Sequence, residues 1–314
     1  MKSSPEQAMK ASSGYVFDIK RFATHDGEGI RTTIFLKGCP LRCAWCQNPE
    51  GLYPYPQILY METKCIHCGS CAAAAVKKGI CISGDRLKLQ READEDWENL
   101  VEICPSGALR YDAKCCSVEE ILHEIRKDSA FFRYGGGVTL SGGEPLLQSA
   151  FALEILKACK AEGIHTTIET SLYAPQDILR QLLPYLDHIY ADLKIFDSAV
   201  HKAYTGVENA QILDNIRYLL CSEELRDRVI IRTPLIPEMT ARSENITDIA
   251  QFLQQCYKGV RYELLNYNPL AKAKYDYLDM EYCFDQNPKL YTKEAMESFY
   301  RIARDQGIRN LIIE

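Results

Sequence analysis

Short apolar runs rich in β-branched residues alternate with longer amphipathic segments along most of the chain. Runs of this length are typical of buried strands, and the segments between them repeat apolar residues at the spacing of a helix. This alternation predicts βα units arranged around a parallel sheet. The predicted strands are Thr32–Leu36, Gly137–Leu140, His165–Glu169, His188–Leu193, Arg228–Thr233 and Tyr262–Asn266, with a seventh at Asn310–Ile313.

Two of the predicted helices have recognisable ends. Ser117 is followed three residues later by Glu120, which is the arrangement of a capping box at a helix start. A second helix, within the run LLQSAFALEILKACKAEG, ends at Gly163, where a helix C-cap belongs. These signals indicate one helix before and one helix after the predicted strand Gly137–Leu140.

One segment interrupts the alternation of strands and helices. Residues 64–116 hold seven of the fourteen cysteines and separate the first predicted strand from the next βα unit. We therefore expect a small inserted domain at 64–116, between a first part of the main domain at 14–63 and its remainder at 117–314. We find no low-complexity tract in the sequence and no repeat beyond the βα alternation.

The composition is that of a globular protein. With 314 residues, 46% of them hydrophobic, the chain can form one large α/β domain or a domain with an insertion. A net charge of −6, a pI near 5.7 and the absence of a long Lys/Arg run argue against nucleic acid or an anionic membrane as a partner. The N-terminal run MKSSPEQAMKASSGYVF lacks the apolar core of a signal peptide, and no transmembrane stretch occurs, so we expect a cytoplasmic protein.

The first cysteine motif, KGCPLRCAWCQNPEG, directly follows an apolar strand. In a reducing compartment, fourteen cysteines indicate metal or redox chemistry rather than disulfides. Cys39, Cys43 and Cys46 supply three thiolates, whereas a [4Fe–4S] cube needs one ligand on each iron. The spacing therefore predicts a cube with one open iron. A structural zinc site with a distant fourth ligand, or buried free cysteines, are the alternatives.

The second motif follows the ferredoxin spacing for three cysteines and then departs from it. Cys65, Cys68 and Cys71 fit, but Ala75 stands where the fourth cysteine of such a run belongs. Cys104, followed by proline, fits the last position of a second run whose other cysteines are absent. We expect one closed [4Fe–4S] site here, with a zinc knuckle on the same cysteines as the alternative. Cys81, Cys115 and Cys116 lie near enough to compete as ligands, and Cys159, Cys221, Cys256 and Cys283 are expected to be packing residues.

Polar residues gather at the carboxyl ends of five predicted strands, where the functional groups of a βα barrel lie. Each could by itself be a helix cap or a surface pair, but together at one end of a barrel they suit an amino-acid-bearing nucleoside. Carboxylates bind ammonium and ribose hydroxyls, and cations bind a carboxylate. The residues are Ser141-Gly142-Gly143-Glu144, Glu169-Thr170-Ser171, Asp192 and Lys194, Arg232, and Asn266 and Asn268.

These motifs resemble a known family, the radical S-adenosylmethionine (SAM) enzymes, and within it the activating enzymes of glycyl-radical enzymes. The resemblance is carried by HDGEGIRTTIFLKGCPLRCAWCQNPEG, the cysteine-rich insert, TLSGGEPLLQ, IETS, DLK and HKAYTG, and it runs from about Phe17 to the C-terminus. Trp45 and Asn48-Pro49-Glu50 are marks of the subfamily. The fold that the resemblance implies is α/β, a partial (β/α)6 TIM-like radical SAM barrel with an inserted ferredoxin-like [4Fe–4S] domain.

The resemblance also implies an oxidoreductase mechanism. SAM would bind the open iron through its amine and carboxylate, and an electron from the cluster would release a 5′-deoxyadenosyl radical that takes hydrogen from a backbone glycine of a partner enzyme. The implied partners are a glycyl-radical enzyme as protein substrate and a flavodoxin or ferredoxin as electron donor, with the chain itself a monomer. The implied cofactors are two [4Fe–4S] clusters, SAM and a monovalent cation.

Residue roles follow from the resemblance position by position. Cys39, Cys43, Cys46 and Lys194 would be catalytic, and Asp26, Gly27 and Gly29 would face the partner's glycyl peptide. The cation would lie near Glu169, Thr170 and Asp192. The residues expected to bind the cofactor are Trp45, Gly142, Gly143, Glu144, Glu169, Thr170, Asp192, Lys194, Arg232 and Asn268.

Two positions depart from the family pattern. Glu28 replaces a proline between the glycines of the peptide-facing turn, which removes a fixed φ, and Asn268 replaces a histidine expected near the methionine part of SAM. Besides the function that the resemblance implies, two other functions stay open at this point. One is a radical SAM enzyme that acts on a small molecule or another protein, and the other is a ferredoxin-like electron carrier or a zinc-stabilised binding module.

Overall fold

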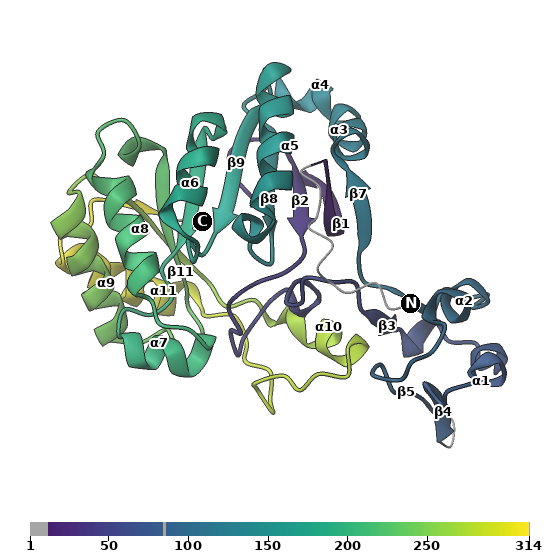
Figure 1. Cartoon of the computed structure of the whole chain (residues 1–314). Helices are drawn as coiled ribbons and strands as arrows, with labels where there is room; N and C mark the ends of the chain where they lie inside the picture. The colour runs from purple at the N-terminus through teal and green to yellow at the C-terminus, as the bar shows by residue number, and fades with distance from the viewer. Residues whose placement is uncertain (1–11, 84–85, 314) are drawn as a thin grey trace.

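The computed structural model describes residues 12–83 and 86–313, and its centre is one nine-stranded sheet (Figure 1). The strand order across the sheet is β13-β12-β11-β10-β9-β8-β2-β1-β7. The strands are β1 (Ser13–Ala23), β2 (Arg31–Leu36), β7 (Lys114–Ser117), β8 (Gly137–Gly142), β9 (His165–Thr170), β10 (His188–Asp192), β11 (Val229–Pro234), β12 (Arg261–Leu265) and β13 (Asn310–Ile312).

The seven strands predicted from the sequence are all present, and they form the parallel part of the sheet. From β2 to β13 each strand pairs in parallel with the next one along the sheet. The two remaining strands, β1 and β7, were not predicted, and they extend the sheet beyond β2 with antiparallel pairing. The predicted α/β class with a mainly parallel sheet is therefore confirmed.

Helices connect the parallel strands and bury one face of the sheet. Alternate side chains of a strand point to opposite faces, so Val138 and Leu140 of β8 and Ile168 of β9 enter the apolar core with the helices. The helices are α3 (Val118–Arg126), α4 (Ser129–Phe132), α5 (Ser149–Ala161), α6 (Gln176–Leu182), α7 (Ser198–Thr205), α8 (Ala210–Cys221), α9 (Ser243–Cys256), α10 (Lys272–Tyr277) and α11 (Lys293–Asp305).

Both predicted helix ends are confirmed. The Ser117 hydroxyl accepts a hydrogen bond from the Glu120 backbone N–H at 3.2 Å, and the Glu120 carboxylate accepts one from the Ser117 N–H at 2.7 Å, which completes a capping box before α3. Gly163 follows α5 with φ +70°, a left-handed conformation that costs glycine little.

A small unit separates from the main sheet on one side of the molecule (Figure 1). It has its own apolar cluster, formed by Ile58, Ile80, Leu100 and Leu109. Its elements are β3 (Ile58–Tyr60), paired with β6 (Leu109–Tyr111), and β4 (Ile80–Ser83), paired with β5 (Arg86–Leu89), with α1 (Ser70–Ala74) and α2 (Trp97–Glu102).

The small unit differs from the expected boundaries of 64 and 116 for a topological reason. Its first strand, Ile58–Tyr60, pairs with Leu109–Tyr111 and brings residues before 64 into the unit. The strand Lys114–Ser117 instead pairs with β1 and belongs to the main sheet. Cys115 and Cys116 therefore lie in the main sheet and not in the small unit.

The four cysteines expected to be packing residues divide into two groups. Cys159 is buried in the core, and Cys256 is half-buried against it. Cys221 and Cys283 are exposed, so the prediction is wrong for these two. Cys221 is the last residue of α8, where a side chain can point to solvent, and Cys283 lies in an irregular segment after α10.

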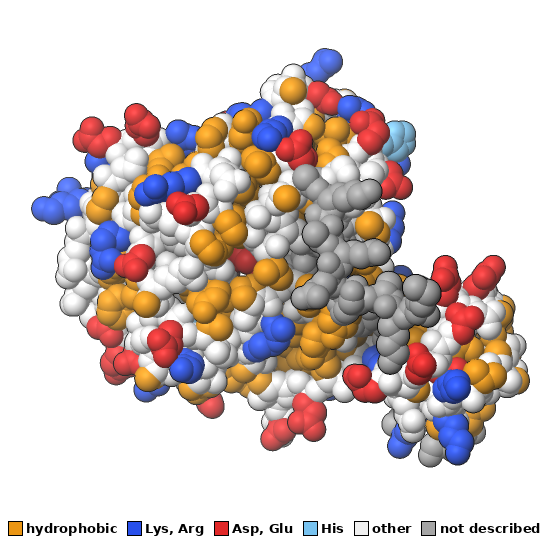
Figure 2. All heavy atoms as spheres, viewed as in Figure 1, with side chains coloured by type: hydrophobic (Ala, Val, Ile, Leu, Met, Phe, Trp, Pro, Cys, Tyr) orange, Lys and Arg blue, Asp and Glu red, His pale blue; other side chains and the backbone are white. Residues whose placement is uncertain are grey.

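On the face shown in Figure 2, acidic and basic side chains are interspersed, and no large patch carries charge of one sign. None of the helices in the described ranges is long and apolar enough to cross a membrane. Most of the N-terminal run that was expected to lack a signal peptide, residues 1–11, lies outside the described residues.

Candidate functional site

The three-cysteine loop leaves the carboxyl end of β2 and is closed at its base by backbone hydrogen bonds. The Gly38 N–H donates to the Gly51 carbonyl at 2.8 Å, and the Cys39 N–H donates to the Leu52 carbonyl at 3.1 Å. The Ala44 N–H donates to Tyr204 at 2.9 Å, which fixes the tip of the loop to α7. The loop is therefore held at both its base and its tip.

The structure brings the three thiols of this loop together in a poorly solvated place. Burial raises the pKa of Cys46 to about 12 and raises the pKa of Cys39 and Cys43 as well. The three groups also act on one another electrostatically, and Lys194 partly offsets the effect at Cys43. Thiolates there need a bound cation, which iron would supply.

Within the described ranges, no group of three His, Cys, Asp or Glu side chains is close enough to hold one metal ion. A single ion needs its ligands gathered around one point. A cube carries one thiolate on each of its irons, so its ligands are spread around the whole cluster. The donor set and its position on one closed loop fit a cube.

The Gly142-Gly143-Glu144 turn packs directly on the base of the cysteine loop. A Cβ on Gly143 would lie 2.3 Å from the Gly38 carbonyl oxygen and 2.4 Å from that of Gly51. The Glu144 N–H donates to the Gly38 carbonyl at 2.7 Å. Only glycine lets these two segments approach so closely.

The Glu144 carboxylate points into the protein and is fully engaged. It accepts hydrogen bonds from the Thr170 hydroxyl at 2.6 Å, the Ser171 N–H at 2.7 Å and the Leu146 N–H at 3.1 Å. Glu144 as a whole is only 1% exposed. The Glu144 carboxylate is therefore occupied by groups of the protein itself, and the Thr170 hydroxyl is occupied by its hydrogen bond to Glu144.

Two ion pairs join the carboxyl ends of β9, β10 and β11 beside the cysteine loop. Arg232 pairs with Glu169 at 2.7 Å and Lys194 pairs with Asp192 at 2.7 Å. The Arg232 Nε lies 3.4 Å from Asp192 Oδ1, and the Ser141 hydroxyl donates to Glu169 at 2.6 Å. We call the two carboxylates and two cations the charge network.

The charge network is held ionised by its own members. Burial opposes ionisation, yet Lys194 and Arg232 outweigh it and lower the pKa of Asp192. Burial likewise lowers the pKa of Lys194, but Asp192 and Cys43 outweigh that effect, so the pKa is raised overall. The network contains equal numbers of positive and negative groups, so it can receive a zwitterion by exchanging partners.

Other predicted site residues lie elsewhere or serve another contact. The Trp45 indole is 3% exposed and packs with Ile195, Ile236 and Tyr267. Asn268 is exposed, and its side chain caps the short 3-10 helix Pro269–Ala271 through the Leu270 N–H at 3.0 Å.

The loop that contains Asp26 and the glycines at 27 and 29 lies near the start of β2 and β8, whereas the cysteine loop follows the end of β2. The Asp26 carboxylate accepts from the Thr33 hydroxyl at 2.8 Å, and its carbonyl accepts from Thr139 at 2.7 Å. A Cβ on Gly29, where φ is +71°, would lie 2.5 Å from the Gly135 backbone. The structure does not bring this loop together with the cysteines.

The four cysteines predicted as ligands in the small unit line one cavity of about 240 Å³. The Leu109 N–H points at the Cys104 sulfur at 3.4 Å. Cys81 does not line this cavity, although its neighbour Ile82 does. The lining cysteines are Cys65, Cys68, Cys71 and Cys104.

Sequence reasoning missed residues that hold the cysteine loop from outside. Lys274 of α10 pairs with Glu50 at 2.7 Å, and the Tyr275 hydroxyl donates to the Cys46 carbonyl at 3.0 Å. Lys37, at the end of a buried strand, was also missed. Its position directly after an apolar strand could have identified it, because a lysine at such a place is buried only when it pairs with an acidic group.

Comparisons with known proteins give the chain's relationships. The model of the family described as the Radical SAM superfamily matches residues 33–252. The chain is 42% identical over 278 residues to the (2S)-3-sulfopropanediol dehydratase activating enzyme of Klebsiella oxytoca, covering 86% of each protein. It is 38% identical to the isethionate sulfite-lyase activating enzyme of Nitratidesulfovibrio vulgaris, covering 87% of this chain and 90% of that protein. It is 37% identical to the indoleacetate decarboxylase activating enzyme of Tractidigestivibacter scatoligenes, covering 85% and 87%.

Proposed function

This chain belongs to the radical SAM superfamily and, within it, to the activating enzymes of glycyl-radical enzymes, and on that premise we propose that it installs a glycyl radical in a partner enzyme. The observation that carries the proposal is the closed loop with three converging cysteines beside the charge network. Cys39, Cys43 and Cys46 would hold a [4Fe–4S] cluster, which in its reduced form would supply the electron for the reductive cleavage of SAM.

The chain's own residues would bind and orient SAM. The charge network offers cations for the carboxylate of SAM and carboxylates for its ammonium and ribose groups. The backbone carbonyls of Gly142 and Gly143 would receive the amine. A monovalent cation would have to compete with Arg232 and Lys194 for Glu169 and Asp192, so we assign these carboxylates to SAM rather than to an ion.

We propose a second [4Fe–4S] cluster in the small unit, on Cys65, Cys68, Cys71 and Cys104. The shared cavity supports this assignment, and it favours these four sulfurs over Cys81, Cys115 and Cys116. Four ligands close every iron of a cube, so this cluster would not bind SAM. Electrons would come from a flavodoxin or ferredoxin, with the chain acting as a monomer.

The partner belongs, in our proposal, to the dehydratase, sulfite-lyase and decarboxylase group of glycyl-radical enzymes. The names of the relatives support this choice, because each names an activator of such an enzyme. The loop with Asp26, Gly27 and Gly29 stays our proposal for the contact with the glycyl peptide. Glu28, in place of proline, would then distinguish the partner of this chain from others.

The test is an anaerobic activation assay. The reconstituted chain is mixed with SAM, a reductant and a candidate partner, and a glycyl doublet is sought by electron paramagnetic resonance. Formation of 5′-deoxyadenosine without any doublet, across partners of all three classes, would contradict the proposal and favour a radical SAM enzyme with another target.

A pair of cysteine variants provides the control. Cys43→Ala removes one thiolate of the three-cysteine loop, so we expect neither doublet nor deoxyadenosine. Cys221→Ala removes an exposed thiol outside both cysteine sets and should leave both signals within about twofold.

A further inference from the structure

One fully buried ion pair joins the cysteine loop to the small unit. Lys37 Nζ lies 2.6 Å from Asp112 Oδ2, and neither side chain is exposed to solvent. Lys37 comes two residues before Cys39, and Asp112 follows β6, the last strand of the small unit. The same ammonium also donates to the Glu50 carbonyl, close to where the cysteine loop ends.

The other oxygen of Asp112 completes the junction. Asp112 Oδ1 accepts from the Gln57 N–H at 2.9 Å, directly before β3 enters the small unit. One carboxylate therefore fixes the entry and the exit of the small unit, and one ammonium fixes the start and the end of the cysteine loop. The two groups meet in a single contact.

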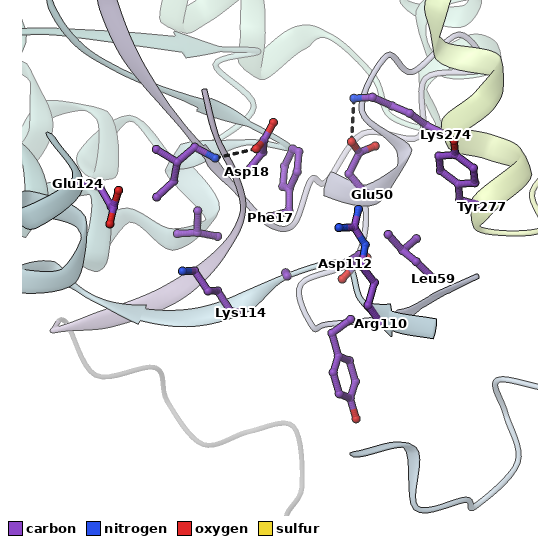
Figure 3. Close-up of a pocket in the computed structure, with 14 residues that line it drawn as sticks. Phe17, Asp18, Glu50, Leu59, Arg110, Asp112, Lys114, Glu124, Lys274 and Tyr277 are labelled. Atoms are coloured by element: carbon purple, nitrogen blue, oxygen red, sulfur yellow. Dashed lines mark hydrogen bonds and ion pairs between the residues drawn. The ribbon is translucent and has the colours of Figure 1, made fainter. Parts of the chain in front are cut away.

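A second connection runs through α10. Arg91 of the small unit donates to the Tyr277 carbonyl at 3.2 Å and pairs with Asp279 at 2.6 Å. At its other side, α10 holds the cysteine loop through the Lys274 pair with Glu50. Figure 3 shows Lys274 reaching from α10 to Glu50, with Asp112 in the same pocket, whose volume is about 790 Å³.

Stability alone is a weak reason for such a pair. Removing two charges from water costs free energy that their attraction often fails to recover, and apolar pairs of similar size are frequently as stable. Buried pairs of this kind can instead specify one arrangement of the elements that they join. Here the joined elements are the cysteine loop and the small unit.

We propose that Lys37 and Asp112 are positioning residues through which the small unit fixes the cysteine loop in the geometry that binds SAM. The small unit then supports the catalytic cluster by holding the cysteine loop in place, and this role is independent of any electron transfer by its own cluster. This inference rests on the proposed function, because it assumes that the cysteine loop binds SAM. The contacts of Lys37 and Asp112 themselves do not depend on SAM or on the partner enzyme.

The test compares two variants with the unaltered full chain after anaerobic reconstitution. Asp112→Asn keeps the shape of the side chain and removes its charge. The double variant Lys37→Met with Asp112→Leu removes both charges and fills the space with apolar groups, so we expect it to fold even if the single variant does not. Arg110→Ala, an exposed position two residues before Asp112, is the matched control.

Two readouts separate positioning from mere folding. Amide hydrogen exchange of residues 38–52 should become at least tenfold faster in both variants. SAM binding, measured by the change that SAM causes in the electron paramagnetic resonance spectrum of the catalytic cluster, should weaken at least tenfold. The signal of the second cluster and the behaviour of the Arg110 control should stay unchanged. Loop exchange and SAM binding within twofold of the unaltered chain in the double variant would overturn the proposal. Because exchange is measured without SAM or partner, that result does not depend on the proposed function.

Discussion

At the scale of single residues, the charge network shows how far strand ends can be interpreted from sequence. Glu169, Asp192, Lys194 and Arg232 each lie within one residue of the carboxyl end of a predicted strand, and parallel pairing brings them together. The engagement of Glu144 could not be predicted, because it depends on where hydroxyl groups of the neighbouring strand point. Position along the chain was predictable, whereas direction of the side chain was not.

Removing one charge of the network should weaken SAM binding. Glu169→Gln leaves Arg232 without its closest carboxylate, and a hydrogen bond to a charged group contributes about 2 kcal/mol, which is about thirtyfold in the dissociation constant of SAM. Calorimetric titration of the reconstituted chain measures this change. Glu154→Gln breaks an exposed pair with Lys157 and should change binding by less than about twofold, and equal effects of the two variants would refute the assignment.

Two histidines at the start of β9 and β10 predict a loss of stability in acid. Burial lowers the pKa of both His165 and His188, and nearby Arg31 lowers them further. In acid the folded chain then binds fewer protons than the unfolded chain. The contribution of the two histidines to the free energy of unfolding is therefore complete above about pH 6.5, and it is lost as the pH falls through their lowered pKa values.

Thermal unfolding of the apoprotein at about pH 7.5 and about pH 5.5 measures this effect. His188→Asn removes one of the two groups, so its midpoint should fall less between these pH values than that of the unaltered chain. An equal fall in both proteins would mean that the histidine does not contribute.

At the scale of elements, the parallel strands were predictable because each is an uninterrupted apolar run. The strand β1 was missed although Val16 and its neighbours alternate, since most of its second half is exposed or only half-buried and gives a weak apolar signal. The strand β7 is short and pairs only with β1 across a hundred residues of sequence. Such pairing depends on contacts that no local pattern records.

The contact between the glycine turn and the cysteine loop gives a prediction at this scale. In Gly143→Ala the new methyl group would meet the Gly38 and Gly51 carbonyls, so the loop must shift and the catalytic cluster should be lost while the second cluster remains. Iron analysis should fall from about eight to about four irons per chain. Gly163→Ala meets no atom within 4 Å and carries only backbone strain, so it should keep all the iron, and full iron in Gly143→Ala would contradict the packing argument.

At the scale of the whole molecule, the sequence predicted a separate small unit but not its limits. The ferredoxin-type spacing of its cysteines identified four sulfurs that line one cavity. Its boundaries depend on pairing between Ile58–Tyr60 and Leu109–Tyr111, and its junction depends on Lys37 and Asp112, which are far apart in the chain. Both features become visible only when the two units are placed together.

The two units predict separable iron contents. Cys68→Ala should remove the cluster of the small unit and leave about four irons, with SAM still able to perturb the spectrum of the remaining cluster. Cys81→Ala should keep about eight irons, because its sulfur does not line the cavity. Loss of iron in the second variant with retention in the first would move the ligand assignment to Cys81.

The central claim is that this chain takes a hydrogen atom from a backbone glycine of a partner enzyme. The most direct measurement uses a partner whose glycines carry deuterium at Cα and follows the label after anaerobic reaction with SAM and reductant. We predict one deuterium in each 5′-deoxyadenosine formed and one glycyl radical for each label transferred. Deoxyadenosine without deuterium, in a partner that shows no glycyl doublet, would contradict the account.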